Sequence, residues 1–193
     1  MVGPNPTPEF LSELPVTRAA LEYATGLHDG QRRQSDGGPF IAHPLEVASL
    51  LAATGADDEV VAAGVLHDTL EKTPADRAEL SGRFGDRVAA LVSAVSEDES
   101  IANYGHRKAA LRDNVAAAGP DALAVFAADK VSKARELRLG LPLGPGLLER
   151  RLDHYNRCLL LLAQRLPDSS LVRELEEELR TLQAPATPAR AVA

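Results

Sequence analysis

Apolar residues recur every three or four positions along most of this chain, which is the spacing of one face of an α-helix. The first such segment, RAALEYATGL, follows Thr17, a residue that can cap a helix. In HPLEVASLLAATG, Pro44 suits a first helical turn and Gly55 suits a helix end. Asp57 can cap the next helix, which we expect to run through AAGVLHDTLEK and to end near residues 73–74.

Later segments show the same helical spacing, and no segment alternates between apolar and polar residues as a strand does. These segments are GDRVAALVSAVSE, HRKAALRDNVA, DALAVFAADKVSKARELR, residues 147–166 and SSLVRELEEELR. The proline-rich start and the final APATPARAVA lack a periodic apolar face. We therefore predict an all-α fold with a single domain over residues 17–183, between flexible ends at residues 1–16 and 184–193.

The acidic composition of the chain limits the classes of partner that it is expected to bind. A net charge of −7 over 193 residues opposes binding to nucleic acid or to an anionic membrane surface, yet a local basic pocket can still bind a small anion. The only cysteine, Cys158, lies in the apolar run RCLLLLA, so we expect a buried thiol and a reducing, cytoplasmic setting. No targeting signal or long apolar span is evident, so no membrane partner is predicted.

The stretch AAGVLHDTLEKTP places polar and charged groups in an otherwise buried helical pattern. On a helix, His67 shares a face with Glu71, and Asp68 shares one with Glu71 and Lys72. Burying such groups without partners costs several kcal/mol. A divalent ion such as Mn, Fe, Zn or Co would compensate them, because imidazole and carboxylate are its usual ligands.

Two ligands do not complete a metal site, so others must come from elsewhere in the chain. His43 precedes Pro44 at the start of a predicted helix, Asp129 lies in AVFAADKVSK, and His28 lies beside a polar loop. Spacing alone does not choose among these three residues.

Taken together, these segments resemble a known family. FIAHP, VLHDTLE and AADK resemble the H…HD…D signature of the HD-domain metal-dependent phosphohydrolases. HDGQRRQSDGGPFIAHPLEVASLLA is similar to the opening of the hydrolase domain of the Rel/SpoT proteins and of the stand-alone guanosine-polyphosphate hydrolases. FGDRVAALVSAVSE and FAADKVSKARELR also follow in that family's order, so the resemblance covers roughly residues 17–140. It implies an all-α HD-domain bundle.

The resemblance also implies a reaction and a set of residues. It implies removal of the 3′-pyrophosphate from ppGpp or pppGpp with one Mn²⁺-like divalent transition metal ion. The matching metal ligands are His43, His67, Asp68 and Asp129. Glu71 matches the acidic residue that orients or deprotonates the attacking water. Arg33 matches the residue that stacks on the guanine, and Arg107 and Lys108 match a basic pair near the phosphates.

The chain departs from the family's pattern around the substrate. Lys72 replaces an aspartate, Gln34 a lysine, Lys133 an asparagine, and Ser132 an aromatic residue or histidine. Lys72 and Lys133 are candidate phosphate ligands. The alternatives are a cation at a helix C-terminus for Lys72 and an i,i+4 ion pair with Asp129 for Lys133.

These departures leave alternative functions open. One is a metal-dependent phosphohydrolase with another nucleotide substrate, and the other is a degenerate domain that binds a nucleotide without cleaving it. The run RELEEELR is most simply a solvated helix face, and a contact between copies of the chain is its alternative.

Overall fold

The computed structural model describes residues 9–139 and 144–184, and helices form its regular structure. Within these ranges the only strand-like pairing is an isolated bridge between Arg32 and Pro39, so the predicted all-α fold is confirmed. In chain order the elements are the 3-10 turn η1 (Glu9–Ser12) and the helices α1 (Pro15–Leu27), α2 (Ala42–Ala53), α3 (Asp58–Leu66), α4 (Thr69–Lys72), α5 (Arg77–Phe84), α6 (Asp86–Val95), α7 (Tyr104–Ala118), α8 (Pro120–Leu139), α9 (Pro145–Arg165) and α10 (Ser170–Gln183).

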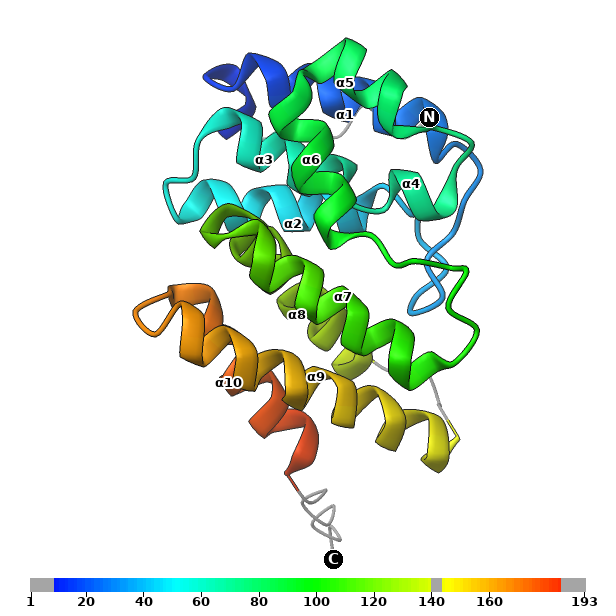
Figure 1. The fold of residues 1–193 in the computed structure, drawn as a ribbon, viewed down its shortest axis with the longest axis vertical. Coiled ribbons are helices and arrows are strands. Elements are labelled where there is room, and N and C mark those ends of the chain that lie inside the picture. Colours follow the sequence, from blue (N-terminus) through cyan, green and yellow to red (C-terminus); the bar gives the residue numbers. More distant parts are fainter. Residues whose placement is uncertain (1–8, 140–143, 185–193) are drawn as a thin grey trace, which may run out of the picture.

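Helix α8 is the central element of the bundle. It packs against α2, α3, α6, α7, α9 and α10. In Figure 1, α1 to α6 fill the upper part of the molecule, α9 and α10 fill the lower part, and α7 and α8 lie between them. A helix enclosed in this way is apolar on most of its faces, as the buried run from Ala122 to Val131 in α8 is. Asp129 and Lys130 are the charged residues buried in that run.

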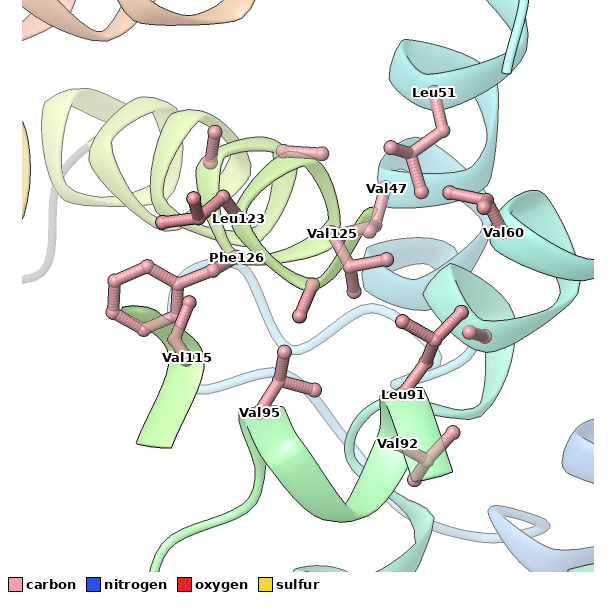
Figure 2. Packing of buried hydrophobic residues seen from close by; sticks show 14 of the residues in the cluster. Val47, Leu51, Val60, Leu91, Val92, Val95, Val115, Leu123, Val125 and Phe126 are labelled. Atoms are coloured by element: carbon pink, nitrogen blue, oxygen red, sulfur yellow. The ribbon is translucent and has the colours of Figure 1, made fainter. Parts of the chain in front are cut away.

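The core is built where α8 meets the N-terminal helices. Figure 2 shows side chains of α2, α3, α6, α7 and α8 converging, among them Val47, Leu91, Val115 and Val125. Phe126 is the largest fully buried side chain, with 1% of its surface exposed. This packing fixes the relative positions of α2, α3 and α8, the three helices at which the predicted metal ligands lie.

Helices α2 and α3 approach closely at a glycine. A Cβ atom added to Gly64 would lie 2.4 Å from Leu51 Cδ1 and 3.3 Å from Val47 Cγ1. Leu51 and Val47 are fully buried, so neither side chain has room to withdraw. The absence of a side chain at Gly64 therefore permits the spacing of α2 and α3.

The first helix begins differently from the prediction. Helix α1 begins at Pro15, and Thr17 is a buried residue of its first turn rather than its N-cap. The carboxylate of Asp58, in the first turn of α3, accepts hydrogen bonds from the backbone N–H groups of Val16 and Thr17 at 2.8 Å each. A residue distant in sequence thus supplies the cap, which local sequence does not reveal. Leu11 in η1 is also buried; residues 1–8 and 185–193, which belong to the predicted flexible ends, lie outside the described ranges.

The helix predicted through the HD dipeptide is interrupted. Asp57 caps α3 as predicted, its carboxylate accepting from Val60 N–H at 3.0 Å. Helix α3 ends at Leu66, however, and His67 and Asp68 form a turn before the short helix α4. Helix α5 was not predicted, because Leu80 is its one buried residue and its apolar spacing is weak.

The acidic run on α10 is partly paired with α8 rather than solvated. Glu174 and Glu178 contact the guanidinium of Arg135, and Glu178 also contacts Arg138. Helix α10 also buries leucine and valine side chains against the bundle. In the described part of the chain, no helix combines the length and the apolar character needed to cross a membrane.

Candidate metal centre and adjoining cavity

Three parts of the fold bring four predicted ligands to one buried point. His43 comes from the first turn of α2, His67 and Asp68 from the turn between α3 and α4, and Asp129 from α8. His43 Nε2 lies 3.2 Å from His67 Nε2, 3.2 Å from Asp129 Oδ1 and 3.6 Å from Asp68 Oδ2. His67 Nε2 lies 3.3 Å from Asp129 Oδ1 and 3.4 Å from Asp68 Oδ2. All four side chains are buried.

Hydrogen bonds at the far side of each ring orient both histidines. His67 Nδ1 lies 2.8 Å from the backbone carbonyl of Gly64, which can only accept, so Nδ1 carries the proton. His43 Nδ1 lies 2.8 Å from Ser132 Oγ, and that hydroxyl donates to Glu46 Oε2 at 2.8 Å. Ser132 therefore accepts from His43 Nδ1–H. In both rings the Nε2 atom is left with its lone pair facing the centre.

The two carboxylates add further acceptors. Asp68 Oδ2 is buried and receives no hydrogen bond, and Asp129 Oδ1 is buried with the Lys133 ammonium 2.8 Å away as its cationic neighbour. Four lone-pair donors thus face one another, which is repulsive unless a cation lies between them. Donor atoms that share an ion at about 2.1 Å lie roughly 3.0–3.4 Å apart, close to the distances in this group. His43, His67 and Asp129 therefore form a candidate divalent-metal site, and Asp68 lies within reach of it.

Neighbouring charges keep the two carboxylates of the centre ionised. Burial acts to raise the pKa of Asp129, but the ammonium groups of Lys130 and Lys133 outweigh it and hold the pKa well below its usual range. Burial lowers the pKa of His43. Burial acts in the same direction on His67, but the carboxylates of Asp68 and Asp129 outweigh it and raise the pKa. Both carboxyl groups are consequently ionised and available as ligands at neutral pH.

Three lysines contact the two carboxylates. Lys72 Nζ lies 3.2 Å from Asp68 Oδ1, and Lys133 Nζ lies 2.8 Å from Asp129 Oδ1 and 3.9 Å from Asp68 Oδ1. Lys130 pairs with Asp129 Oδ2. The predicted i,i+4 ion pair between Lys133 and Asp129 is therefore present, and it involves the same oxygen that faces the two imidazoles.

A cavity of about 810 Å³ opens beside these lysines. Its wall contains eight lysine and arginine side chains and three glutamates, although the whole chain is acidic. The lysines are Lys72, Lys108, Lys130 and Lys133, and the arginines are Arg32, Arg33, Arg150 and Arg151. Phe40 and Tyr104 contribute aromatic surface. The cavity suits a polyanionic ligand that carries an aromatic group.

Most of the predicted substrate-binding residues line this cavity, and Arg107 is the exception. Arg33, Lys72, Lys108 and Lys133 all belong to the wall. The Arg107 guanidinium instead donates to Glu97 Oε2 and to the carbonyl of Ile101, both at 2.8 Å, and lies outside the wall. Arg107 therefore stabilises the segment between α6 and α7, to which Glu97 and Ile101 belong.

Glu71 lies on the same wall, between the metal centre and α6. Its Oε1 atom accepts from the backbone N–H of Glu97 at 2.7 Å, and its Oε2 atom lies 4.0 Å from Lys72 Nζ. His28, the third open candidate for a ligand, lies outside the group; its Nδ1 atom faces Gln31 Oε1 at 2.8 Å.

Sequence reasoning missed several residues of the cavity. Glu97 pairs with Lys108 and Arg107, and Lys130 is fixed against the Phe126 ring with Nζ 4.4 Å from its centroid. The adjacent charges in the AADK segment were a signal for Lys130. Arg150 and Arg151 lie on a long helix with no local signal, because only the tertiary fold brings them to the cavity wall.

Comparison with known proteins assigns the class. A family model described as HD domain matches residues 20–138, so the chain belongs to the HD domain family. Human guanosine-3′,5′-bis(diphosphate) 3′-pyrophosphohydrolase MESH1 is 32% identical over 174 residues, which cover 89% of this chain and 94% of that protein. A solved structure described as a metazoan ortholog of SpoT that hydrolyzes ppGpp superposes with a TM-score of 0.76 at 25% identity, covering 93% of this chain and 98% of that one.

Longer bacterial proteins are also similar over part of their length. A probable GTP pyrophosphokinase of Mycobacterium leprae is 33% identical over 169 residues, and a guanosine-3′,5′-bis(diphosphate) 3′-pyrophosphohydrolase of Aquifex aeolicus is 47% identical over 78 residues. The matches span 21% and 11% of those two proteins. The chain therefore corresponds to a small part of these relatives.

Proposed function

We propose that this protein is a metal-dependent phosphohydrolase that removes the 3′-diphosphate from guanosine 3′,5′-bis(diphosphate). The observation that carries the proposal is the buried group of four lone-pair donors beside a cavity rich in lysine and arginine. The similarity to human MESH1 over nearly the full length of both proteins supports the choice of substrate.

In this proposal His43, His67, Asp68 and Asp129 hold one divalent ion, with Mn²⁺ as the first choice. When bound, such an ion polarises a phosphoryl oxygen and makes water more acidic. Ser132 and the carbonyl of Gly64 hold the two imidazoles so that Nε2 faces the ion. The carboxylates remain ionised because the lysines around them stabilise their charge.

The remaining residues are proposed to bind the substrate and to accept the proton of the attacking water. Glu71 Oε2 is the group proposed to take the proton of the attacking water, since Oε1 is held by Glu97 N–H. Lys72, Lys108 and Lys133 are proposed to neutralise the phosphate oxygens as charge develops on the leaving diphosphate. Arg33 is proposed to stack on the guanine base. Its pairing with Asp36 holds the guanidinium plane at the cavity wall.

The test is to incubate the purified chain with Mn²⁺ and ppGpp and to measure released pyrophosphate and phosphate separately. We expect pyrophosphate alone, and we expect Glu71→Gln to lower the rate by about 10²–10⁴-fold while Mn²⁺ binding is retained. Release of orthophosphate, or full activity in Glu71→Gln, would contradict the proposed reaction.

The second candidate function is a domain that binds the nucleotide without cleaving it, and the positions of Lys72 and Lys133 are the reason to consider it. Their ammonium groups contact Asp68 and Asp129, the carboxylates proposed as metal ligands. Lys72→Asp restores the acidic residue of the family's pattern. If the wild type is inactive and this variant gains pyrophosphate release, the result would favour the sensor. If the wild type is active and the variant has unchanged or reduced activity, the result would favour the hydrolase.

A further inference from the structure

The lysines of this chain are concentrated at one place. The sequence contains four, Lys72, Lys108, Lys130 and Lys133, and all of them line the cavity beside the metal centre. Apart from its five histidines, the other basic residues of the chain are arginines. An ammonium group is a compact point charge that can exchange one anionic partner for another, whereas the planar guanidinium prefers fixed bidentate contacts.

Lys133 differs from the other lysines in the oxygen that it contacts. Lys72 contacts Asp68 Oδ1 and Lys130 contacts Asp129 Oδ2, and both of these oxygens point away from the imidazoles. Lys133 Nζ lies 2.8 Å from Asp129 Oδ1. That oxygen is also 3.2 Å from His43 Nε2 and 3.3 Å from His67 Nε2. A metal ion at the centre and the ammonium of Lys133 would therefore share one carboxylate oxygen.

The position of Lys133 also allows its charge to move. Its side chain is 28% exposed and belongs to the cavity wall, whereas Lys130 is 4% exposed and fixed on the Phe126 ring. An anion in the cavity offers the Lys133 ammonium an alternative partner. When the ammonium turns toward that anion, it withdraws from Asp129 and leaves the oxygen to the metal ion.

We infer that Lys133 couples the two ligands of this centre, because its ammonium opposes a divalent ion at Asp129 and a phosphate-type dianion in the cavity relieves that opposition. The inference rests on the proposed metal centre. Coupling of this kind is reciprocal, so the ion must tighten anion binding by the same factor as the anion tightens ion binding. Lys133 is thus a specificity-determining residue that favours substrates whose phosphoryl groups carry two charges next to the metal.

The test measures Mn²⁺ binding to the full chain by calorimetry, with sulfate as a tetrahedral dianion that is not hydrolysed. Chloride at equal ionic strength serves as the reference. In the wild type we expect sulfate to tighten Mn²⁺ binding by about tenfold. In Lys133→Met we expect Mn²⁺ binding without sulfate to be about tenfold tighter than in the wild type, and the effect of sulfate to fall below about threefold.

Two further variants separate this role from a general loss of charge or of structure. Lys108→Met removes the same charge from the same cavity, but Lys108 pairs with Glu97 and contacts no proposed metal ligand. Its Mn²⁺ affinity without sulfate should stay within about twofold of the wild type. Lys133→Arg keeps the charge, so its Mn²⁺ affinity without sulfate should stay as weak as in the wild type, whereas its guanidinium exchanges partners less readily and its sulfate effect should be smaller. Thermal melts of each variant confirm that it is folded.

Mn²⁺ affinities that are equal in the wild type and Lys133→Met, or sulfate effects of the same size in both, would overturn the inference and leave the proposed metal centre intact. Mn²⁺ binding that is absent from the wild type would overturn both. Mn²⁺ binding to the wild type that survives in His67→Ala would show an ion held elsewhere, and it too would overturn both.

Discussion

At the scale of single residues, the imidazole of His43 is the end of a chain of polar contacts that begins on α10. Glu174 and Glu178 hold the Arg135 guanidinium, which donates to Glu46 Oε1 at 2.9 Å. Glu46 Oε2 accepts from Ser132, and Ser132 accepts from His43. Because the Ser132 hydroxyl donates to Glu46, it accepts from His43 Nδ1–H, and the tautomer and orientation of His43 depend on residues that are not candidate ligands.

Replacing Ser132 tests that chain of contacts. Ser132→Ala removes the acceptor of His43 Nδ1–H and frees the ring to rotate, so Mn²⁺ affinity measured by calorimetry should fall by about 10-fold or more. Ser93→Ala is the matched control. The Ser93 hydroxyl bonds Ala89 O within its own helix, so this variant should bind Mn²⁺ as the wild type does. Equal affinities in the wild type and Ser132→Ala would show that His43 is oriented by packing alone.

The candidate ligands could be proposed from the sequence, but their meeting point could not. The polar groups of His67 and Asp68 in an apolar run were visible as an anomaly, and His43 and Asp129 joined them only through the family resemblance. His28 was an equal candidate by spacing, and the fold directs it to Gln31 instead. Glu46 and Ser132 gave no local signal, because their roles depend on contacts between helices that are distant in sequence.

At the scale of helices, the contact between α2 and α3 sets the distance between the two histidines. His43 begins α2 and His67 follows the end of α3, so a shift of one helix against the other moves both Nε2 atoms apart. The closest part of this contact is at Gly64, whose carbonyl also accepts from His67 Nδ1. One residue thus determines both the spacing of the helices and the orientation of a candidate ligand.

Gly64→Ala should damage stability and metal binding together. The added methyl group has no room against Leu51 and Val47, so we expect a loss of about 1–3 kcal/mol in the free energy of unfolding, measured by urea denaturation. Mn²⁺ affinity should fall as well. Gly26→Ala is the control: Gly26 lies in α1 with nothing within 4 Å of its added Cβ, so this change should be neutral or stabilising by up to about 1 kcal/mol. Similar stabilities of the two variants would contradict the close contact.

The helices themselves were largely predictable, and their interruptions were not. The apolar spacing predicted helices where α6, α7, α8 and α10 are found in the structure. The pattern through AAGVLHDTLEK is continuous, yet the chain turns at His67–Asp68, because the contacts of both side chains at the centre outweigh helical propensity. Thr17 was predicted as a cap by residue type alone, whereas Asp58 of another helix fills that role.

At the scale of the whole molecule, the candidate centre joins elements that are far apart in the chain. Its side chains come from the start of α2, the turn after α3 and the middle of α8, which is the helix that contacts both halves of the bundle. An unfolded chain does not hold these groups together. A metal ion that binds only the folded state should therefore stabilise the entire bundle.

Thermal unfolding measures this linkage. At a free Mn²⁺ concentration of 100 times the dissociation constant, the stabilisation should be about 2.7 kcal/mol, which raises Tm by roughly 5–10 °C for a domain of this size. A chelator should reverse the shift. His67→Ala lacks a central ligand, so its Tm should be insensitive to Mn²⁺. An equal rise in that variant would place the ion elsewhere on the protein.

The gathering of every lysine at the cavity has a practical consequence for handling the protein. Reagents that acylate primary amines, such as those used to attach dyes or to couple proteins to sensor surfaces, would react with side chains only at the cavity, because all four lysines line it. Lys72 and Lys133 are the more accessible of the four, with side chains 35% and 28% exposed. Protein immobilised through its lysines would therefore be blocked, and attachment through an added terminal tag would leave the cavity open.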